Sequence, residues 1–115
     1  MKRSDIYSLN EAYNQMNQVR YIDKIALIDR HFEGSSEPVI VAQANIGKEH
    51  KDIINVAFAV PGCSCDLEHG FLDNKGEFLN RKDALILAKQ TDQVIDLNQV
   101  VDDELTSQNC RPYNP

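Results

Sequence analysis

The chain has 115 residues, of which 42% are hydrophobic. This fits one domain with a modest core, because a chain of this length buries only about two-thirds of its unfolded surface. The net charge is −6, from 18 acidic and 12 basic residues, and no run of Lys and Arg stands out. Duplex nucleic acid is therefore a poor candidate partner, since its binding needs clustered cations. The charge does not exclude a small anionic ligand, which needs only two or three well-placed arginines.

Targeting signals are not evident in the sequence. No apolar stretch approaches the roughly 20 residues that a membrane-spanning helix needs, so no membrane partner is expected. Residues 1–5 carry positive charge without an apolar run behind them, which is not the pattern of a signal peptide. With three cysteines, an odd number, the chain is predicted to be cytoplasmic with reduced thiols.

Residues 4–18 are predicted to form an amphipathic helix. Ser4 is a suitable N-cap. Apolar residues recur at spacings of three and four and make one stripe, which consists of Ile6, Leu9, Tyr13 and Met16. The stripe is narrow, so we expect residues 1–20 to be a helical arm that needs a surface to lie on. That surface belongs either to its own domain, which is the simpler interpretation, or to a partner subunit.

Two strands and a helix are predicted next. Nearly continuous apolar residues predict a strand over residues 21–29, and a second strand follows over residues 39–47. The pair suggests an antiparallel hairpin with a long connection. A helix is then predicted from residue 48 to the stop signal at Pro61-Gly62.

A compact hairpin and a second helix follow a polar, cysteine-bearing loop. Residues 69–79 contain two short strands around a turn, with Gly76 at the tight position. Asn80 is a good N-cap, and Asp83 suits the first turn of a helix that runs to about residue 90.

The predicted elements amount to an α+β fold in a single domain over residues 1–115. A small antiparallel sheet with two core helices occupies residues 21–97, and residues 1–20 add the N-terminal amphipathic helix. Residues 94–97 suggest a short strand, and residues 98–115 are expected to be an irregular C-terminal tail.

Cys63, Cys65, His69 and Cys110 are candidate zinc ligands. The Cys63-x-Cys65 spacing is tighter than usual and no second pair follows, so ordinary reduced thiols are the better interpretation. A zinc-dependent nucleobase deaminase would need a His-x-Glu motif, which is absent. We therefore expect neither a metal nor a cofactor.

His50 and Asp52 lie near the start of the helix predicted from residue 48. Two residues apart on a helix, they point to different faces, so a His-carboxylate pair for acid–base catalysis is not expected. A helix N-terminus offers free backbone N–H groups to an anion. His50 is therefore a candidate ligand contact, with capping and a surface role as the alternative.

Four further residues are candidate nucleotide contacts. Phe71 is suited to stack on a base, Arg81 to pair with a phosphate, and Asn80 to bind a base edge or ribose. The alternative is that Phe71 is core, Asn80 only a cap and Arg81 a solvated residue. In the tail, Arg111 near Tyr113 is suited to clasp a nucleotide, with a disordered end as the alternative. No nucleophile–base signature, Gly-rich phosphate loop or carboxylate dyad is visible in the sequence, so an enzyme is not expected.

The run HGFLDNKGEFLNRKDA at residues 69–84 resembles a signature of small phage proteins. In these proteins a Gly-Phe strand, a Gly turn and a Phe-x-Asn/Asp-Arg segment lead into a helix with alternating alanines. Residues 47–54 resemble their Gly-x-x-His-x-x-Ile-Ile element, and residues 105–107 weakly resemble their C-terminal Leu-x-Ser segment. The resemblance covers roughly residues 22–107 and leaves the N-terminal arm outside.

Among such proteins, the chain resembles the Thoeris anti-defence 1 family. The resemblance implies a non-catalytic phage protein in the host cytoplasm that sequesters glycocyclic ADP-ribose, so that a NAD-degrading effector stays off. Some members are thought to bind cyclic oligonucleotides as well. It also implies an α+β fold and homo-oligomers with ligand sites at subunit interfaces. By motif, Phe71 and Asn80 match the aromatic and Asn contacts of the family, and Arg111 is a loose candidate for its C-terminal arginines.

Two functions follow from these observations. In the first, the chain is a homo-oligomeric sponge for a cyclic ADP-ribose-type nucleotide, and its ligand-binding residues are Phe71, Asn80, Arg81, His50 and Arg111. In the second, it is a phage-type inhibitor or adaptor that acts on a host protein through the N-terminal arm and the acidic surface.

Overall fold

The computed structural model describes residues 19–115, and the helix predicted over residues 4–18 lies outside them. The described chain forms a four-stranded antiparallel sheet in the order β2-β1-β3-β4. Its strands are β1 (Ile22–Asp29), β2 (Val39–Asn45), β3 (Leu67–Asp73) and β4 (Phe78–Asn80). Two helices complete the core, α2 (His50–Phe58) and α3 (Arg81–Gln90). The predicted α+β fold is therefore confirmed, with the strands and helices close to their expected positions.

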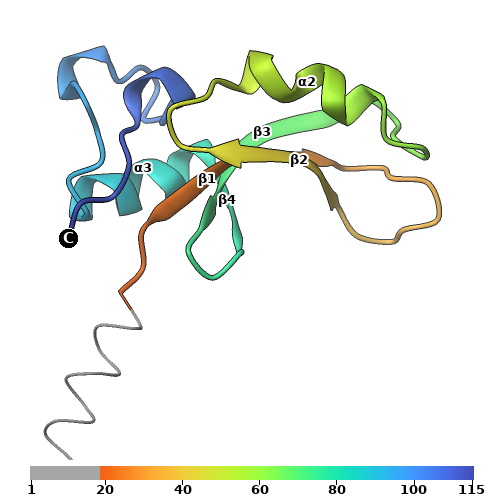
Figure 1. The fold of residues 1–115 in the computed structure, drawn as a ribbon, viewed down its shortest axis with the longest axis horizontal. Helices are drawn as coiled ribbons and strands as arrows, with labels where there is room; N and C mark the ends of the chain where they lie inside the picture. Colours follow the sequence, from red (N-terminus) through yellow and green to blue (C-terminus); the bar gives the residue numbers. More distant parts are fainter. Residues whose placement is uncertain (1–18) are drawn as a thin grey trace, which may run out of the picture.

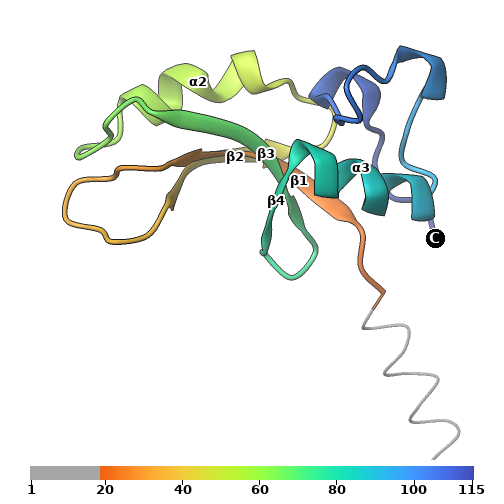
Figure 2. The same ribbon diagram turned by 180° about the vertical axis from the view of Figure 1, so that it is seen from behind.

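The helices cover different strands of the sheet. Helix α2 packs on β1 and β2, whereas α3 packs mainly on β3 and β4. Figure 1 shows α2 alongside the sheet and the C-terminal segment running from α3 toward the start of α2. Seen from behind, α3 begins directly where β4 ends (Figure 2). This arrangement brings the start of α2 and the start of α3 close to the same stretch of β3.

The position of β1 inside the sheet explains why its sequence is almost continuously apolar. It lies between β2 and β3, so Ile25, Ala26 and Leu27 are all fully buried. Ile25 pairs with Phe71, and Leu27 pairs with His69. Phe71 and His69 are two residues apart on β3 and so point to the same face of the sheet.

Both helices begin with the capping signals that the sequence contains. Glu49 and Asp52 form a reciprocal capping box at the start of α2. At the start of α3, the Asn80 side chain accepts a hydrogen bond from the Asp83 N–H at 2.8 Å. The first residue of each helix is therefore fixed by local hydrogen bonds.

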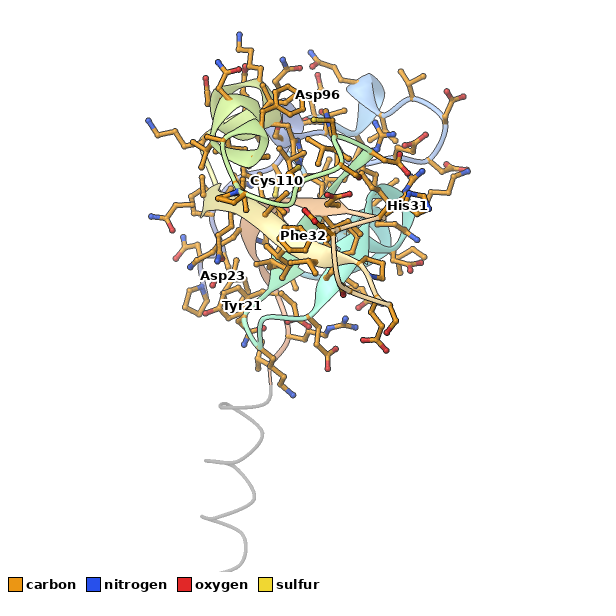
Figure 3. The ribbon with its side chains drawn as sticks, turned by 90° about the vertical axis from the view of Figure 1, so that its right-hand side faces the viewer. Tyr21, Asp23, His31, Phe32, Asp96 and Cys110 are labelled. Atoms are coloured by element: carbon orange, nitrogen blue, oxygen red, sulfur yellow. The ribbon has the colours of Figure 1, made fainter. Side chains whose placement is uncertain are left out.

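The C-terminal segment is irregular, as expected, but it is packed against the rest of the domain. Leu105 is fully buried, and Asn109 and Cys110 are 4% and 3% exposed. The strand expected over residues 94–97 is reduced to one bridge between Val94 and Cys110, because the Asp96 side chain caps a 3-10 turn (Leu97–Gln99) that redirects the chain. In the end-on view of Figure 3, Asp96 lies near the outer surface and Cys110 lies deeper, toward the sheet.

A buried glutamine connects this segment to the sheet. Gln93 is fully buried, and its side chain accepts from the Ile22 N–H at 2.9 Å and donates to the Ile22 carbonyl at 2.7 Å. It also donates to the Arg111 carbonyl at 3.2 Å. These bonds hold the start of β1 against the last residues, so that Tyr21 stacks on Tyr113 with ring centroids 4.3 Å apart.

Among the described residues, no helix combines the length and the apolar character needed to cross a membrane.

Candidate functional site: a histidine and arginine groove

Phe71 is in the core rather than at the surface. Its ring is fully buried, and its strand neighbours are Ile25 and Leu79. It cannot stack on a ligand base from this position, so the stacking role predicted for it is corrected to a packing role. Its edge contacts the ring of His50 at a centroid distance of 5.4 Å and an interplanar angle of 85°. Phe71 therefore packs against His50, a candidate site residue, from the core.

His50 is the first residue of α2 and is held firmly. It is 7% exposed, and its Nε2 lies 2.8 Å from the Gly70 carbonyl oxygen. Because a carbonyl can only accept, Nε2 must carry a proton. The backbone N–H of His50 donates to Ser107 Oγ at 3.2 Å. The ring is also stacked on His69, with centroids 4.8 Å apart and an angle of 16° between the planes.

Gly70, between His69 and Phe71, leaves room for the Phe78 ring because it has no side chain. A Cβ at this position would collide with the Phe78 ring and the Leu79 carbonyl. The Gly-Phe pair of the sequence pattern thus has two separate roles. Gly70 admits the Phe78 ring and offers its carbonyl to His50, and Phe71 fills the core.

Two hollows share the side chains of His69 and Arg81. The first, of about 200 Å³, is also lined by His50, Glu49, Lys51, Thr106, Ser107 and Gln108. The second, of about 230 Å³, is also lined by Asn80, Lys82, Arg30, Glu68 and Glu104. We call these two hollows together the histidine groove. The structure thus brings together three of the predicted ligand-binding residues, namely His50, Asn80 and Arg81.

Asn80 and Arg81 are each partly engaged in the fold. Asn80 is exposed, and its Oδ1 caps α3 as described above. The Nε of Arg81 lies 2.9 Å from a carboxylate oxygen of Glu104. The predicted capping and ligand roles of Asn80 are compatible, because its amide nitrogen is not used by the cap.

The electrostatics of the groove disfavour charge on its histidines. Burial lowers the pKa of His50, the hydrogen bond to Gly70 opposes this, and the positive charges of His69 and Arg81 lower it further. Burial also lowers the pKa of His69, again assisted by the charge of Arg81. Both imidazoles are therefore predominantly neutral at pH 7.

Sequence reasoning considered His69 only as a zinc ligand and missed it as a partner of His50. The local signal was its position two residues before Phe71, on the same face of a strand. Its stacking partner lies 19 residues away in the chain, so only the packing of α2 against the sheet identifies the pair.

Arg111 lies outside the histidine groove. Its Nε donates to the Asp92 carbonyl at 2.9 Å, and its terminal nitrogen lies 3.1 Å from an Asp92 carboxylate oxygen. Within the single chain, Arg111 therefore does not join the other predicted ligand-binding residues.

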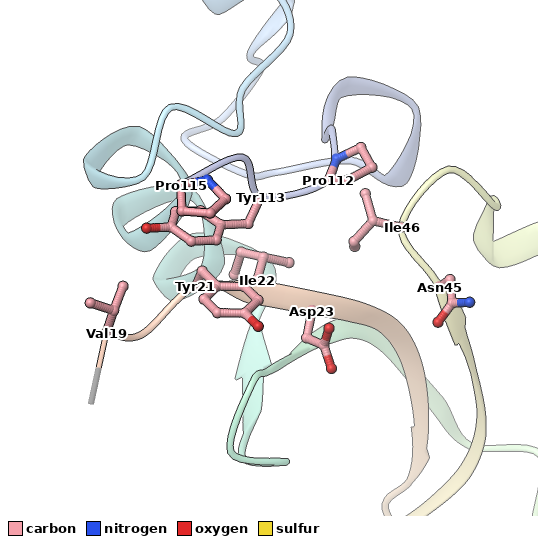
Figure 4. Close-up of a pocket in the computed structure, with 9 residues that line it drawn as sticks. All are labelled: Val19, Tyr21, Ile22, Asp23, Asn45, Ile46, Pro112, Tyr113 and Pro115. Carbon is pink, nitrogen blue, oxygen red and sulfur yellow. The ribbon is translucent and has the colours of Figure 1, made fainter. Parts of the chain in front are cut away.

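A larger and more apolar hollow, of about 760 Å³, lies where the two ends of the described chain meet. We call it the tyrosine groove; it is lined by Val19, Tyr21, Ile22, Asp23, Asn45, Ile46, Pro112, Tyr113 and Pro115. Figure 4 shows the stacked Tyr21 and Tyr113 on one side and Ile46 with Pro112 on the other. The sequence interpretation placed Tyr113 beside Arg111 and did not foresee its contact with Tyr21.

The candidate zinc ligands do not converge. Over residues 19–115, no three His, Cys, Asp or Glu side chains are grouped so that they could hold a metal ion. Cys65 is exposed, whereas Cys110 is buried and burial raises its pKa to about 12. A thiol with such a pKa is a poor metal ligand and a poor nucleophile at neutral pH.

By its architecture, the molecule is a small α+β protein with a four-stranded antiparallel sheet. A family model described as "Phage T4 y16D protein" matches residues 12–110. The chain is therefore a phage protein and belongs to this family. No curated protein and no solved structure matches it. The phage origin implied by the resemblance is confirmed at this coarser level, and the Thoeris anti-defence 1 assignment stays a prediction.

Proposed function

We propose that this phage protein binds and sequesters a cyclic nucleotide signal of bacterial immunity, of the glycocyclic ADP-ribose type, without cleaving it. The observation that carries the proposal is the convergence of His50, His69, Asn80 and Arg81 on the histidine groove. A guanidinium pairs well with phosphate oxygens, and an amide is suited to hydroxyl groups of ribose. Cyclic oligonucleotides present the same groups and are ligands of the same class.

Binding rather than catalysis fits the way the groove is built. The hydroxyl of Ser107 accepts the backbone N–H of His50 at 3.2 Å, and the protonated nitrogen of His50 faces the Gly70 carbonyl. Neither group is arranged as a nucleophile with its base, which would need a hydrogen bond between the two side chains. The groove thus offers an anion the guanidinium of Arg81 and the amide of Asn80.

The size of the groove leads us to propose a homo-oligomer. Its two hollows, of about 200 and 230 Å³, are each smaller than the roughly 300–1,000 Å³ typical of small-molecule sites. Nanomolar affinity corresponds to about −12 kcal/mol and requires a preorganised, mostly enclosed site. In the proposed complex, one chain holds the phosphates and a second chain encloses the rest of the ligand, in the cytoplasm of the host.

Isothermal titration of the full chain with glycocyclic ADP-ribose tests the proposal. We expect a submicromolar dissociation constant, and we expect heated complex to release the ligand unchanged, as measured by chromatography and absorbance. The absence of heat at micromolar protein would refute the proposal. Recovery of a cleaved ligand would instead indicate an enzyme.

Two arginines provide a matched pair of variants that locate the site. The side chains of Arg81 and Arg111 are 46% and 47% exposed, and their ion pairs measure 2.9 and 3.1 Å. We expect Arg81→Ala to weaken binding about 10- to 100-fold, the usual range for a lost charged hydrogen bond. Arg111→Ala should leave affinity unchanged if one chain supplies the phosphate site. Equal losses in both variants would indicate a site to which Arg111 of a second copy also contributes.

The second candidate function is a phage-type adaptor or inhibitor of a host protein, and the tyrosine groove favours it. An apolar hollow of about 760 Å³ with two tyrosines and two prolines is suited to a protein segment. In this case a host protein should be retained stoichiometrically by the wild-type chain and lost with Tyr113→Ala. Nucleotide released from the same material would favour the first function.

A further inference from the structure

The stacked histidines have a consequence for how the histidine groove responds to an anion. We infer that the His50–His69 pair takes up about one proton when a diphosphate-type anion binds, so that the affinity of the groove rises as the pH falls. This inference rests on the proposed function, because it concerns the same groove. It adds to that function the change in protonation that accompanies binding of the anion.

The geometry determines where the proton goes. Since Nε2 of His50 already donates to the Gly70 carbonyl at 2.8 Å, a second proton on this ring can bind only at Nδ1. The His69 ring lies parallel to it at a centroid distance of 4.8 Å. Two imidazolium ions at this spacing repel each other, so the pair accepts one proton far more readily than two.

The acidic side chains that line the groove are already paired with cations. The three are Glu49 with Lys51 at 3.0 Å, Glu68 with Arg30 at 3.1 Å, and Glu104 with Arg81 at 2.9 Å. Lys82 adds a further positive charge at the rim. The lining residues of α2, β3, α3 and the C-terminal segment thus leave no uncompensated carboxylate to stabilise an imidazolium. An external anion would supply that missing negative charge.

The direction of the effect follows from linkage. Burial and the charge of Arg81 lower the pKa of His69 in the free protein, and a bound anion opposes this shift. Between the pKa of His69 in the free protein and its higher pKa in the complex, the complex therefore holds more protons than the free protein. By linkage, affinity increases as the pH falls through this interval, by up to about tenfold per pH unit for one proton.

Glycocyclic ADP-ribose is a suitable probe because a diphosphate diester does not change its charge between pH 5 and pH 8. Titrations of the full chain in two buffers with different ionisation enthalpies give the number of protons taken up. We expect about one proton near neutral pH, and affinity at least tenfold higher at pH 5.5 than at pH 8. Binding with the same affinity at both pH values and no proton uptake would overturn the inference and leave the proposed function intact.

The three histidines allow a second, independent measurement. In an NMR titration of the ring signals, sulfate, which is also non-titrating here, should raise the pKa of His50 or His69. His31 is the control position for substitution because its side chain is 74% exposed and paired with Asp66, outside the groove. His69→Gln should abolish proton uptake, whereas His31→Gln should retain it. A sulfate effect without nucleotide binding would support the inference and refute only the proposed function, and no sulfate effect on either groove histidine would overturn the inference.

Discussion

The histidine groove and the tyrosine groove differ in size and in the contacts that fix their walls. The tyrosine groove is larger, at about 760 Å³ against about 200 and 230 Å³ for the two hollows of the histidine groove. Its walls come from the two ends of the described chain, joined by ring stacking and the Gln93 hydrogen bonds, and from Asn45 and Ile46. In the histidine groove, by contrast, His50 and Arg81 are each fixed by a bond to a partner. Volume limits how much surface a site can bury, whereas fixed polar groups decide what it recognises.

Removing the Phe71 ring, which packs against His50, should have the largest effect on stability. Phe71→Ala deletes a fully buried ring that contacts His50, so we expect the free energy of unfolding to fall by about 3–5 kcal/mol. Denaturant titration measures this loss. Phe58→Ala is the control, because Phe58 is 47% exposed on α2 and its replacement should cost much less. Similar losses in both variants would contradict the core position of Phe71.

The corresponding test of the tyrosine groove is the Gln93 side chain. Gln93→Ala leaves both the N–H and the carbonyl of Ile22 without their buried partner, at a cost of about 1–3 kcal/mol for each unpaired group if no water replaces it. We expect a loss of stability comparable to that of Phe71→Ala, about 2–6 kcal/mol for the two groups together, and less if water replaces the side chain. We also expect a separation of Tyr21 from Tyr113, visible in tyrosine fluorescence or NMR. Gln90→Ala, at an exposed position of α3, is the matched control. An unchanged tyrosine environment would show that the groove does not depend on this connection.

The two grooves also show which parts of the structure local sequence signals can predict. Alternation, periodicity, the Asn80 cap and the Gly76 turn act over a few residues, so the four strands of the sheet and the helices α2 and α3 agree with the prediction. The prediction of a strand over residues 94–97 was wrong. The packing of the C-terminal segment was missed because it depends on Gln93, which contacts a residue 71 positions away. Likewise, the sequence could not show that Phe71 turns inward while His69, on the same face, reaches the rim, since the position of α2 decides this.

The pH dependence of stability should distinguish the histidine groove from the rest of the fold. Because burial lowers the pKa values of His50 and His69, the unfolded chain binds protons that the folded protein does not once the pH falls below about 6.5. Stability should therefore decrease from pH 7 toward pH 5. Burial raises the pKa of Asp29, but hydrogen bonds, chiefly from Ser64, outweigh it and lower the pKa to about 2. The stabilisation from this carboxylate should be lost only as the pH falls from about 4 toward 2.

Denaturant titrations at pH 7, 5.5 and 3 separate these two contributions. His69→Gln should reduce the loss between pH 7 and pH 5.5 and leave the loss below pH 4 unchanged. Ser64→Ala should have the opposite pattern, because it removes the hydroxyl hydrogen bond to Asp29, which lies outside the histidine groove. If neither variant changed its expected interval, the histidine pair and Asp29 would not be the groups that titrate.

The smallest expected effect tests whether the ion pair with Glu104 competes with ligand binding at Arg81. Glu104→Gln removes the charge that is paired with Arg81 at 2.9 Å. An exposed ion pair is worth only about 0–1 kcal/mol, so stability should hardly change. Affinity for glycocyclic ADP-ribose or sulfate should nevertheless rise, by up to about fivefold, because the ligand no longer competes with a carboxylate for the guanidinium. Asp92→Asn, which removes the charge paired with Arg111, should leave affinity unchanged. A gain in the second variant and none in the first would place anion recognition at the C-terminal end of the chain rather than in the histidine groove.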